Sequence, residues 1–318
     1  MKLQDRVSHR LKLRDLRLLL SVMEFGGMAK AAAHLNLTQS GVSKAIADIE
    51  HMLNVRLFDR TSRGVEPTLY GLALRKWGTA MFDDLRQGLN EIEHLADPTT
   101  GELRIGCTEA MTAGFVSAVI DRLTRQYPRL ILRVTQDEPL RLQDLHLHER
   151  KIELVVGRIQ SPFAQQDMQA EVLFKEPALV VAGVQNKWVH RRKIELAELI
   201  DEPWCLPPPE SLSGSHLQRA FRANGLDYPP RSTVVALSTQ LHASLVATGR
   251  YIGILPGAML WFCGKRLSLK VLPVELPIQP RLRSVGIVTL KNRTLSPVAQ
   301  LFIDCAREVA KPLAKHRP

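Results

Sequence analysis

The clearest chemical pattern in the sequence is a group of short polar side chains and one cation near position 40. The group consists of Thr38, Gln39, Ser40, Ser43 and Lys44. Hydroxyl and amide groups hydrogen-bond to base edges, and an ammonium group pairs with a phosphate. The positive end of a helix dipole would favour the same polyanion. The pattern therefore predicts contact with a nucleic acid, and the alternative is a solvated polar face on a helix that only packs.

Other residue combinations give little support for catalysis. His146 and His148 have the spacing of a metal-binding pair but lack a third ligand, so we expect no metal. The four cysteines are far apart and predict buried free thiols in a reducing compartment: Cys107, Cys205, Cys263 and Cys305. No GxSxG, HExxH, Walker or GxGxxG pattern occurs, and nothing indicates a cofactor. We expect that the protein is not an enzyme, with an α/β enzyme that carries a DNA-binding head as an alternative.

Three predicted helices would hold the polar group in place. Apolar residues at helical spacing end at Gly26–Gly27, and an alanine-rich helix over residues 29–35 follows. Asn36 suits the left-handed conformation of a tight turn, and Thr38 can cap the next helix. That helix has an apolar face formed by Val42, Ala45, Ile46, Ile49 and Leu53. A helix-turn-helix has this layout, with the polar face of its last helix in the major groove of DNA.

A short β-hairpin is predicted after the three helices. Residues 55–58 and 65–68 suit two strands, and the turn between them is basic. Arg60 and Arg63 would lie at its tip, where they can reach the DNA backbone or the minor groove. Residues 1–68 are therefore predicted to form an all-α helix-turn-helix domain with a β-wing.

Residues 16–74 resemble the winged helix-turn-helix of LysR-type transcriptional regulators. The matching signature is Ala31-Ala32-x-x-Leu35-x-x-Thr38-Gln39-x-x-Val42-Ser43-Lys44-x-Ile46, followed by Glu50, Leu57-Phe58-x-Arg60 and Pro67-Thr68-x-x-Gly71. Ser40 and Gly41 depart from the family pattern, in which Pro and Ala are frequent. Because glycine within a helix costs about 1 kcal/mol relative to alanine, we expect a looser first turn here. The resemblance implies a regulator that binds promoter DNA and contacts RNA polymerase.

A long linker helix is predicted over residues 69–97, with Thr68 as its N-cap. Apolar residues recur along it every three or four positions, as on a helix that pairs with a partner. We assign to dimerisation Leu74, Trp77, Met81, Leu85, Ile92 and Leu95. The alternative is a helix packed on its own domain. The resemblance also implies a linker helix that builds a homodimer, and such dimers can pair into a tetramer. Two-fold symmetry then predicts an interrupted inverted repeat in the DNA.

From Gly101 onward, stretches typical of strands alternate with helical ones, which predicts α/β structure with a parallel sheet. We expect an effector-binding domain over residues 101–318, with lobe I at about 101–168 and 273–318 and lobe II at about 169–272. Two such lobes leave a cleft at the carboxyl ends of their strands, where ligands bind. This part resembles the periplasmic-binding-protein-like effector domain of the same family, so the resemblance covers essentially the whole chain. Residues 101–123 also resemble a subgroup that controls sugar uptake and catabolism.

Polar residues at predicted strand ends and helix starts are the candidates for contact with this small-molecule effector. They are Thr108, Glu109, Gln136, Gly157, Arg158, Ser238 and Thr239. Each could instead be a helix cap or a satisfied loop residue, and Arg158 could form a surface ion pair. The basic balance of the domain favours an acidic effector, whereas Glu109 argues against one.

The composition agrees with a cytoplasmic protein that binds a polyanion. The 318 residues include 43 Lys and Arg against 32 Asp and Glu, a net charge of +11. This surplus favours nucleic acid over an anionic membrane. Charges between Lys2 and Arg6 argue against a signal peptide, and the longest apolar stretch, residues 251–263, is too short to span a membrane. An architectural DNA-binding protein without an effector is a further alternative, but it would leave residues 101–318 without a role.

Overall fold

The chain folds into two units with separate hydrophobic cores. The computed structural model describes residues 10–61, 64–159, 167–230, 232–276 and 283–315. Contacts divide the chain into Met1–Leu89 and Asn90–Pro318. Among the described residues, the first unit has one hydrophobic cluster, and the second has two for each of its two sheets, one on either face. No helix in the described ranges is long and apolar enough to cross a membrane.

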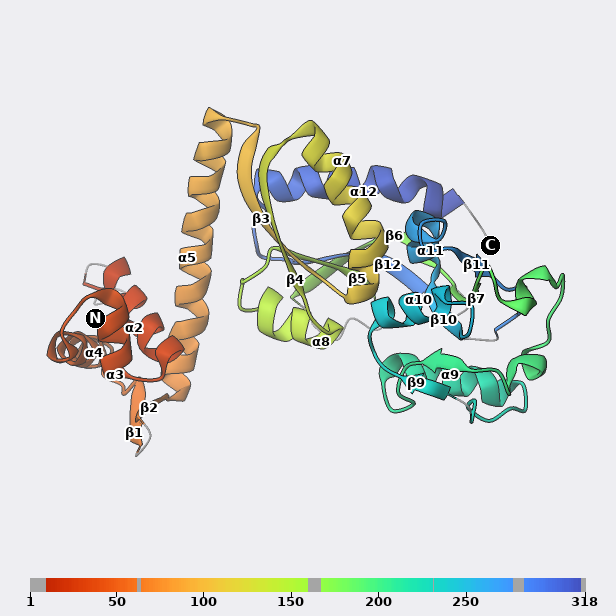
Figure 1. Ribbon diagram of the computed structural model, residues 1–318. Helices are drawn as coiled ribbons and strands as arrows, with labels where there is room; N and C mark the ends of the chain where they lie inside the picture. The colour runs from red at the N-terminus through yellow and green to blue at the C-terminus, as the bar shows by residue number, and fades with distance from the viewer. Residues whose placement is uncertain (1–9, 62–63, 160–166, 231, 277–282, 316–318) are drawn as a thin grey trace. The chain divides into compact units, whose positions relative to one another are not determined.

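Three helices form most of the first unit: α2 (Leu13–Phe25), α3 (Met28–Leu35) and α4 (Gln39–Leu53) (Figure 1). Their apolar faces meet in a core that contains Leu19 and Val42. The small side chains of Ala31 and Ala32 let α3 approach its neighbours closely. Asn36 joins α3 to α4 with a φ of 54°, and its backbone N–H donates to carbonyls of α3. These elements confirm the predicted helix-turn-helix.

The wing of the first unit begins later than predicted. Strand β1 (Phe58–Thr61) pairs antiparallel with β2 (Gly64–Pro67), with Arg60 opposite Val65. The strand predicted from residue 55 is wrong in its first residues because a side chain of α4 binds this segment. Oε1 of Glu50 accepts hydrogen bonds from the backbone N–H groups of Leu57 (2.6 Å) and Phe58 (3.2 Å). Glu50 thereby ties α4 to the wing.

Helix α5 (Leu69–Ala96) is the long helix that the sequence predicts, and it extends across the boundary between the two units. The hydroxyl of Thr68 accepts a hydrogen bond from the backbone N–H of Gly71 at 3.2 Å, as expected of an N-cap. Gly71 lies so close to the wing that a Cβ there would overlap the carbonyl oxygen of Leu57. Any larger residue at this position would therefore push α5 away from the wing.

The second unit contains two five-stranded sheets, and each forms the centre of one lobe. The first sheet has the strand order β4-β3-β5-β12-β6. Its strands are β3 (Thr100–Cys107), β4 (Arg129–Gln136), β5 (Leu154–Arg158), β6 (Met168–Glu176) and β12 (Arg283–Leu290). Strands β3, β4 and β5 are parallel, whereas β12 runs antiparallel to β5 and β6. The sheet is therefore mixed and not parallel throughout.

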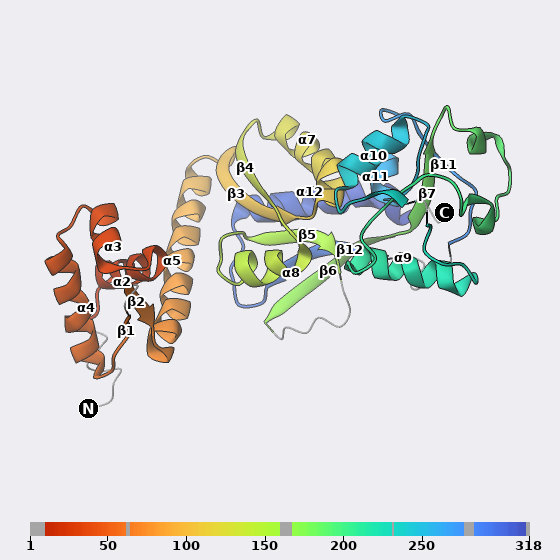
Figure 2. The ribbon, with the colours of Figure 1, turned by 60° about the horizontal axis from the view of Figure 1, so that its bottom comes forward.

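Helices cover both faces of the first sheet (Figure 2). One face packs against α7 (Ser117–Gln126) and α12 (Pro297–Lys315), and this core includes Phe115 and Phe302. The other face packs against the π-helical segment η2 (Leu142–Leu147), which continues α8 (Pro139–Arg141). A second π-helical segment, η1 (Thr112–Val116), separates α7 from α6 (Glu109–Met111). The helical segments over residues 109–126 and 139–147 therefore each contain a π-helical turn.

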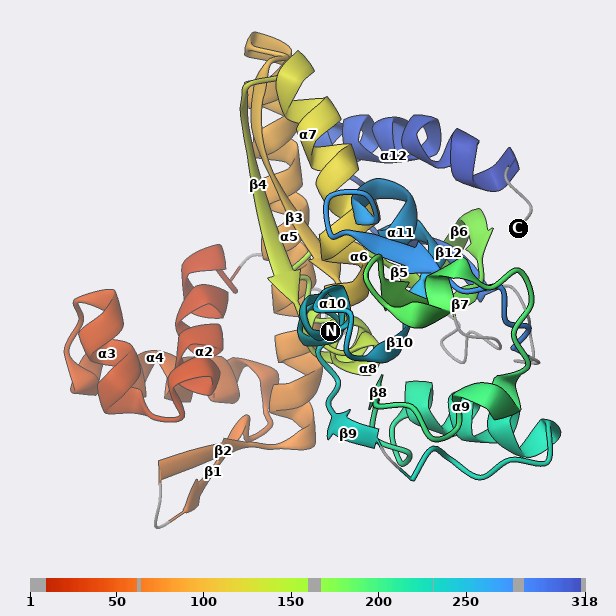
Figure 3. The same ribbon diagram turned by 45° about the vertical axis from the view of Figure 1, so that its right-hand side comes forward.

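The second sheet has the strand order β11-β7-β10-β8-β9. Its strands are β7 (Ala178–Gly183), β8 (Trp204–Leu206), β9 (Ser232–Val235), β10 (Ile252–Pro256) and β11 (Leu269–Val271). Two 3₁₀ segments, η3 (Lys187–His190) and η4 (Leu196–Leu199), lie between β7 and β8. Alternate residues of a strand face opposite sides of its sheet. Val180 accordingly packs with α9 (Leu212–Ala223), whereas Val181 packs with α10 (Thr239–Ala247) and α11 (Gly257–Cys263). Figure 3 shows α9 on one side of this lobe and α10 and α11 on the other.

The chain passes between the lobes later than the predicted boundary near residue 169. Strand β6 pairs with β12 from Met168 to Glu176, so it belongs to the first lobe. The next strand, β7, starts at Ala178 in the second sheet, which places the first crossing at Pro177. The return crossing lies between β11 and β12, in the region where the boundary near residue 272 was expected.

Candidate functional site

The polar group of α4 lies at the amino end of this helix. Its members Thr38, Gln39, Ser40 and Lys44 are exposed, and Ser43 is half-buried. The hydroxyl of Thr38 accepts hydrogen bonds from the backbone N–H of Gly41 (3.1 Å) and from the hydroxyl of Ser40 (3.3 Å). A Cβ at position 41 would lie 3.0 Å from this hydroxyl, so glycine leaves room for the cap. The first turn is thus closed by its cap, unlike the loose turn expected from Gly41.

Charge changes sign along the exposed face of α4. Lys44 is exposed in the amino-terminal half, and Asp48 is exposed one turn further along. Because a carboxylate repels phosphate, only the amino-terminal half of the helix suits a polyanion. The predicted surface has two other basic residues. Arg60 lies on β1 of the wing, and Arg63 lies outside the described residues.

A row of apolar side chains faces solvent along α5. Trp77, Ile92 and Leu95 are 66%, 64% and 77% exposed, and Met81 and Leu85 are also exposed. Leu74, the remaining residue of the predicted stripe, packs instead against the core of the first unit. Single exposed apolar residues are common on protein surfaces, whereas a continuous row marks a contact surface. The row is therefore a candidate contact with a second copy of the same helix.

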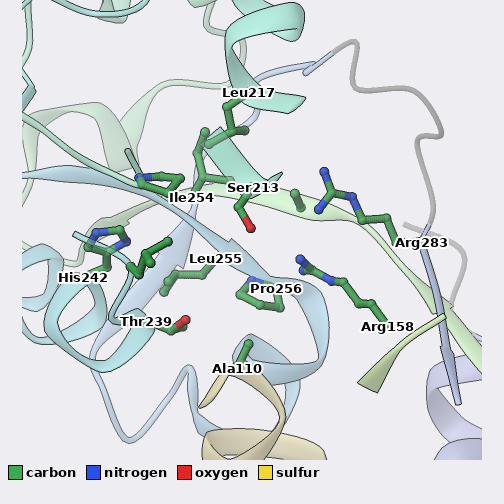
Figure 4. Close-up of a pocket in the computed structure, with 13 residues that line it drawn as sticks. Ala110, Arg158, Ser213, Leu217, Thr239, His242, Ile254, Leu255, Pro256 and Arg283 are labelled. Atoms are coloured by element: carbon green, nitrogen blue, oxygen red, sulfur yellow. The ribbon is translucent and has the colours of Figure 1, made fainter. Parts of the chain in front are cut away.

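A cavity of about 110 Å³ lies between the two lobes of the second unit (Figure 4). The first lobe contributes Ala110, Arg158 and Arg283, and the second contributes the polar residues Ser213, Thr239 and His242 together with apolar side chains. A cavity of about 150 Å³ in another protein holds benzene, so this smaller one suits a small organic ligand. The position matches the predicted cleft.

The structure brings some of the predicted effector residues to this cavity and leaves others away from it. Those that line it are Arg158 and Thr239. Glu109 and Ser238 are hydrogen-bonded to each other next to these lining residues. Three predicted residues do not line it: Thr108, Gln136 and Gly157. Thr108 precedes α6, Gln136 is exposed on the edge strand β4, and Gly157 is buried in β5.

Two arginines give the cavity a positive end. Figure 4 shows the guanidinium groups of Arg158 and Arg283 extending from the same side toward Ser213. Nε of Arg158 lies 3.3 Å from Oε1 of the buried Glu176, whose Oε2 accepts a backbone N–H of α11 at 2.9 Å. The pKa of Arg283 is lowered to about 10, mainly by burial and secondly by the positive charge of Arg158. The negative charge of Glu176 partly offsets this decrease. A bound anion would relieve the repulsion between the two guanidinium groups.

Glu109 joins the two lobes. It is the first residue of α6 in the first lobe, and its carboxylate accepts three hydrogen bonds from the start of α10 in the second. The donors are the hydroxyl of Ser238 (2.8 Å) and the backbone N–H groups of Thr239 (2.8 Å) and Gln240 (3.2 Å). Helix amino ends attract anions, so an internal carboxylate fills a position that a ligand anion could take. Because these donors compensate its charge, Glu109 is no obstacle to an acidic effector at the arginines.

His242 is a cavity residue that the sequence reasoning missed. It follows Thr239 by three residues on α10, and this spacing places both side chains on one face of the helix. The residue is 4% exposed, and its Nε2 has no hydrogen-bond partner within the described part of the chain. Helical spacing from Thr239 is the signal that could have identified it. Arg283 was also missed, because it lies at the start of β12 with no local motif around it.

Metal binding and thiol chemistry find no support in the described ranges. No group of three or more His, Cys, Asp or Glu side chains there could hold a metal ion. His146 and His148 instead lie 3.0 and 3.2 Å from the carboxylate oxygens of nearby aspartates. All four cysteines are free, and burial raises the pKa of Cys107 to about 12 and that of Cys205 to about 11. A raised thiol pKa makes a cysteine a poor nucleophile at neutral pH.

Comparison with known proteins places both units in one family. The LysR substrate binding domain family matches residues 96–311, and the lysR family of bacterial regulatory helix-turn-helix proteins matches residues 13–72. The chain is 29% identical over 305 residues to the HTH-type transcriptional regulator GbpR of Azospirillum brasilense, covering 94% of this chain and 86% of that protein.

Solved structures show the same fold over nearly the whole chain. A point variant of full-length OxyR from Pseudomonas aeruginosa matches with a TM-score of 0.63 and 20% identity, covering 98% of this chain and 100% of that chain. Full-length CbnR in complex with its target DNA matches with a TM-score of 0.61 and 16% identity, covering 94% and 100%. Since the two matched family domains account for both units, the protein belongs to the LysR family of ligand-responsive bacterial transcriptional regulators, with a helix-turn-helix DNA-binding domain and a two-lobed effector domain.

Proposed function

We propose that two or four copies of the protein bind an interrupted inverted repeat in promoter DNA, and that a small acidic effector between the lobes changes this binding. The observation that carries the proposal is the exposed amino end of α4. From Thr38 to Lys44 it presents hydroxyl, amide and ammonium groups on a capped helix. Such groups can read base edges as well as bind phosphates, which favours sequence-specific binding over architectural binding.

The apolar row of α5 supports the dimer in this proposal. In a pair of antiparallel or parallel α5 helices, Trp77, Met81 and Leu85 would be removed from water. A two-fold dimer carries two copies of α4, and each would enter the major groove at one half-site. Arg60 and Arg63 of the wing would then contact the DNA backbone beside each half-site.

The arginine pair supports an acidic effector. Arg158 and Arg283 have the buried carboxylate of Glu176 as a shared counter-charge, so a ligand carboxylate would complete the charge balance of the cavity. Effector binding changes DNA binding only to the extent that the ligand favours one arrangement of the lobes over the other. The hydrogen bonds between Glu109 and α10 cross between the lobes and would differ between such arrangements.

Titration of labelled promoter DNA with Lys44→Ala tests the DNA-binding surface. Affinity should fall, and the slope of log affinity against log salt concentration should decrease by about 1, because one phosphate contact is lost. Lys265→Ala, at an exposed lysine of the second unit, is the matched control and should leave both quantities unchanged. An unchanged salt slope for Lys44→Ala would remove this residue from the DNA contact.

The remaining parts of the proposal concern the setting of the protein. We place it in the cytoplasm, where promoter DNA and RNA polymerase are found, and we expect it to contact the polymerase at its target promoters. We also propose that it acts without catalysis and without a cofactor. Turnover of a bound acid by the purified full-length protein would contradict this part.

A further inference from the structure

We infer that the effector carries a hydrogen-bond donor, a hydroxyl or an amine, which Nε2 of His242 accepts at the end of the cavity away from the two arginines. The inference rests on the proposed function, because it takes the cavity as the effector site. It narrows the effector from acids in general to short monocarboxylates that carry such a donor.

The first support is an unpaired buried atom at the cavity wall. His242 is 4% exposed, and its Nε2 has no hydrogen-bond partner among the residues that the structure describes. Buried polar atoms without a partner are rare because they lose their hydration and gain nothing in return. Since His242 lines the cavity, we assign the missing partner of Nε2 to an occupant of the cavity.

The second support is the protonation state of the ring. Burial lowers the pKa of His242, while the charge of Glu109 and a hydrogen bond to the carbonyl of Ala236 act against this decrease. The ring is therefore neutral at neutral pH. Because Nε2 has no partner among the described residues, Nδ1 is the nitrogen that donates to Ala236. In this tautomer Nε2 carries a lone pair and must accept a hydrogen bond.

The arrangement of the cavity sets the shape of the ligand. Figure 4 shows His242 on the side opposite to Arg158 and Arg283, with Leu255 and Pro256 between them. A carboxylate at the arginines, a short apolar chain along the middle and a donor at His242 would fill the volume of about 110 Å³. A second carboxylate at the histidine end would face the lone pair of Nε2 with no proton to share, so dicarboxylates should be rejected.

Calorimetric titration of the full-length protein with matched four-carbon acids tests the inference. The probes are butanoate, 3-hydroxybutanoate, 4-hydroxybutanoate, 3-aminobutanoate, 4-aminobutanoate and butanedioate, which vary the donor and its position. We expect at least one hydroxy- or amino-substituted butanoate to bind about tenfold more tightly than butanoate itself. Butanedioate should bind more weakly than this preferred substituted butanoate. His242→Phe should reduce the preference to within about twofold, whereas His242→Gln, which keeps an acceptor oxygen, should retain part of it. Arg283→Ala should weaken every acid similarly.

The outcomes separate this inference from the proposed function. If butanoate and all its substituted forms bind equally, and Arg283→Ala loses this binding, the inferred hydrogen-bond donor is wrong. The proposal of an acidic effector would still hold in that case. Binding of no acid, or binding that ignores Arg283→Ala, would overturn both. If His242→Phe does not fold, ¹⁵N NMR of the wild-type histidine decides the matter. The ¹⁵N chemical shift of its Nε2 should change when the preferred hydroxy- or amino-substituted butanoate is added, and much less when butanoate is added. Equal changes in the chemical shift would overturn the inference.

Discussion

The carboxylate of Glu109 illustrates how single residues shape the effector site. The sequence identifies Glu109, Ser238 and Thr239 as candidates because each stands at the start of a predicted helix. It could not pair them, since 129 residues separate Glu109 from Ser238 and only the packing of the two lobes brings them within 2.8 Å. His242 escaped prediction for a related reason. Nothing in its own segment distinguishes a cavity histidine from a core histidine.

Glu109→Gln tests the hydrogen bonds between the lobes. The substitution removes the charge that three donors of α10 share, so we expect the free energy of unfolding of the second unit to fall by about 1–2 kcal/mol. Urea unfolding of the full-length protein measures this difference. The exposed Glu138→Gln in the same unit serves as the control and should change stability by less than about 0.5 kcal/mol. Equal stability of the two variants would contradict the role of Glu109.

At the scale of elements, strong periodicity made the helices predictable and left strand assignments less certain. The stripe on residues 69–97 predicted α5 almost to its ends, because an apolar period near 3.6 that persists over so many residues is typical of a helix and does not occur in a strand. The start of β1 was misplaced because the Glu50 carboxylate, and not a partner strand, accepts hydrogen bonds from the backbone N–H groups of residues 57 and 58. The lobe that contains β6 could not be deduced either, since an apolar strand carries no mark of the sheet it joins.

Met81→Asp tests the pairing of α5 helices. An aspartate in the middle of the apolar row would have to be buried without a partner in the dimer, so the protein should become monomeric or form dimers at least tenfold more weakly. Light scattering at several protein concentrations measures this change. Lys76→Asp introduces the same side chain on another face of α5 and should leave the dimer intact. A dimer of unchanged stability in Met81→Asp would place the interface elsewhere.

Asp137 gives the segment after β4 a stability that depends on pH. The backbone N–H of Glu138 and the side chains of His146 and Arg141 bind its carboxylate and lower its pKa from 3.8 to about 2. Because the folded-state pKa is the lower one, this stabilisation is complete above about pH 4 and is lost as the pH falls toward 2. Asp137→Asn should therefore destabilise the protein in urea at pH 7 more than at pH 3. The same loss at both values would show that ionisation of Asp137 does not matter.

At the scale of the whole molecule, the resemblance of the sequence to one family predicted both the helix-turn-helix domain and the effector domain. Family membership does not determine the ligand, because that depends on the few side chains lining a cavity of about 110 Å³. Of these, Arg158 and Thr239 were predicted, while Arg283 and His242 became visible only once strands β5 and β12 and helix α10 were brought together. The regulatory claim is that occupancy of this cavity alters how two copies of α4 engage DNA.

DNase I footprinting of the DNA upstream of the gene, with and without the acid that binds most tightly in calorimetry, tests this claim most directly. We expect two protected half-sites related by a two-fold axis, with centres about 10 base pairs or a multiple of this apart. We also expect the acid to change this pattern for the wild-type protein and not for Arg283→Ala. Protection of a single unpaired segment, or a pattern that a bound acid leaves unchanged, would contradict the account.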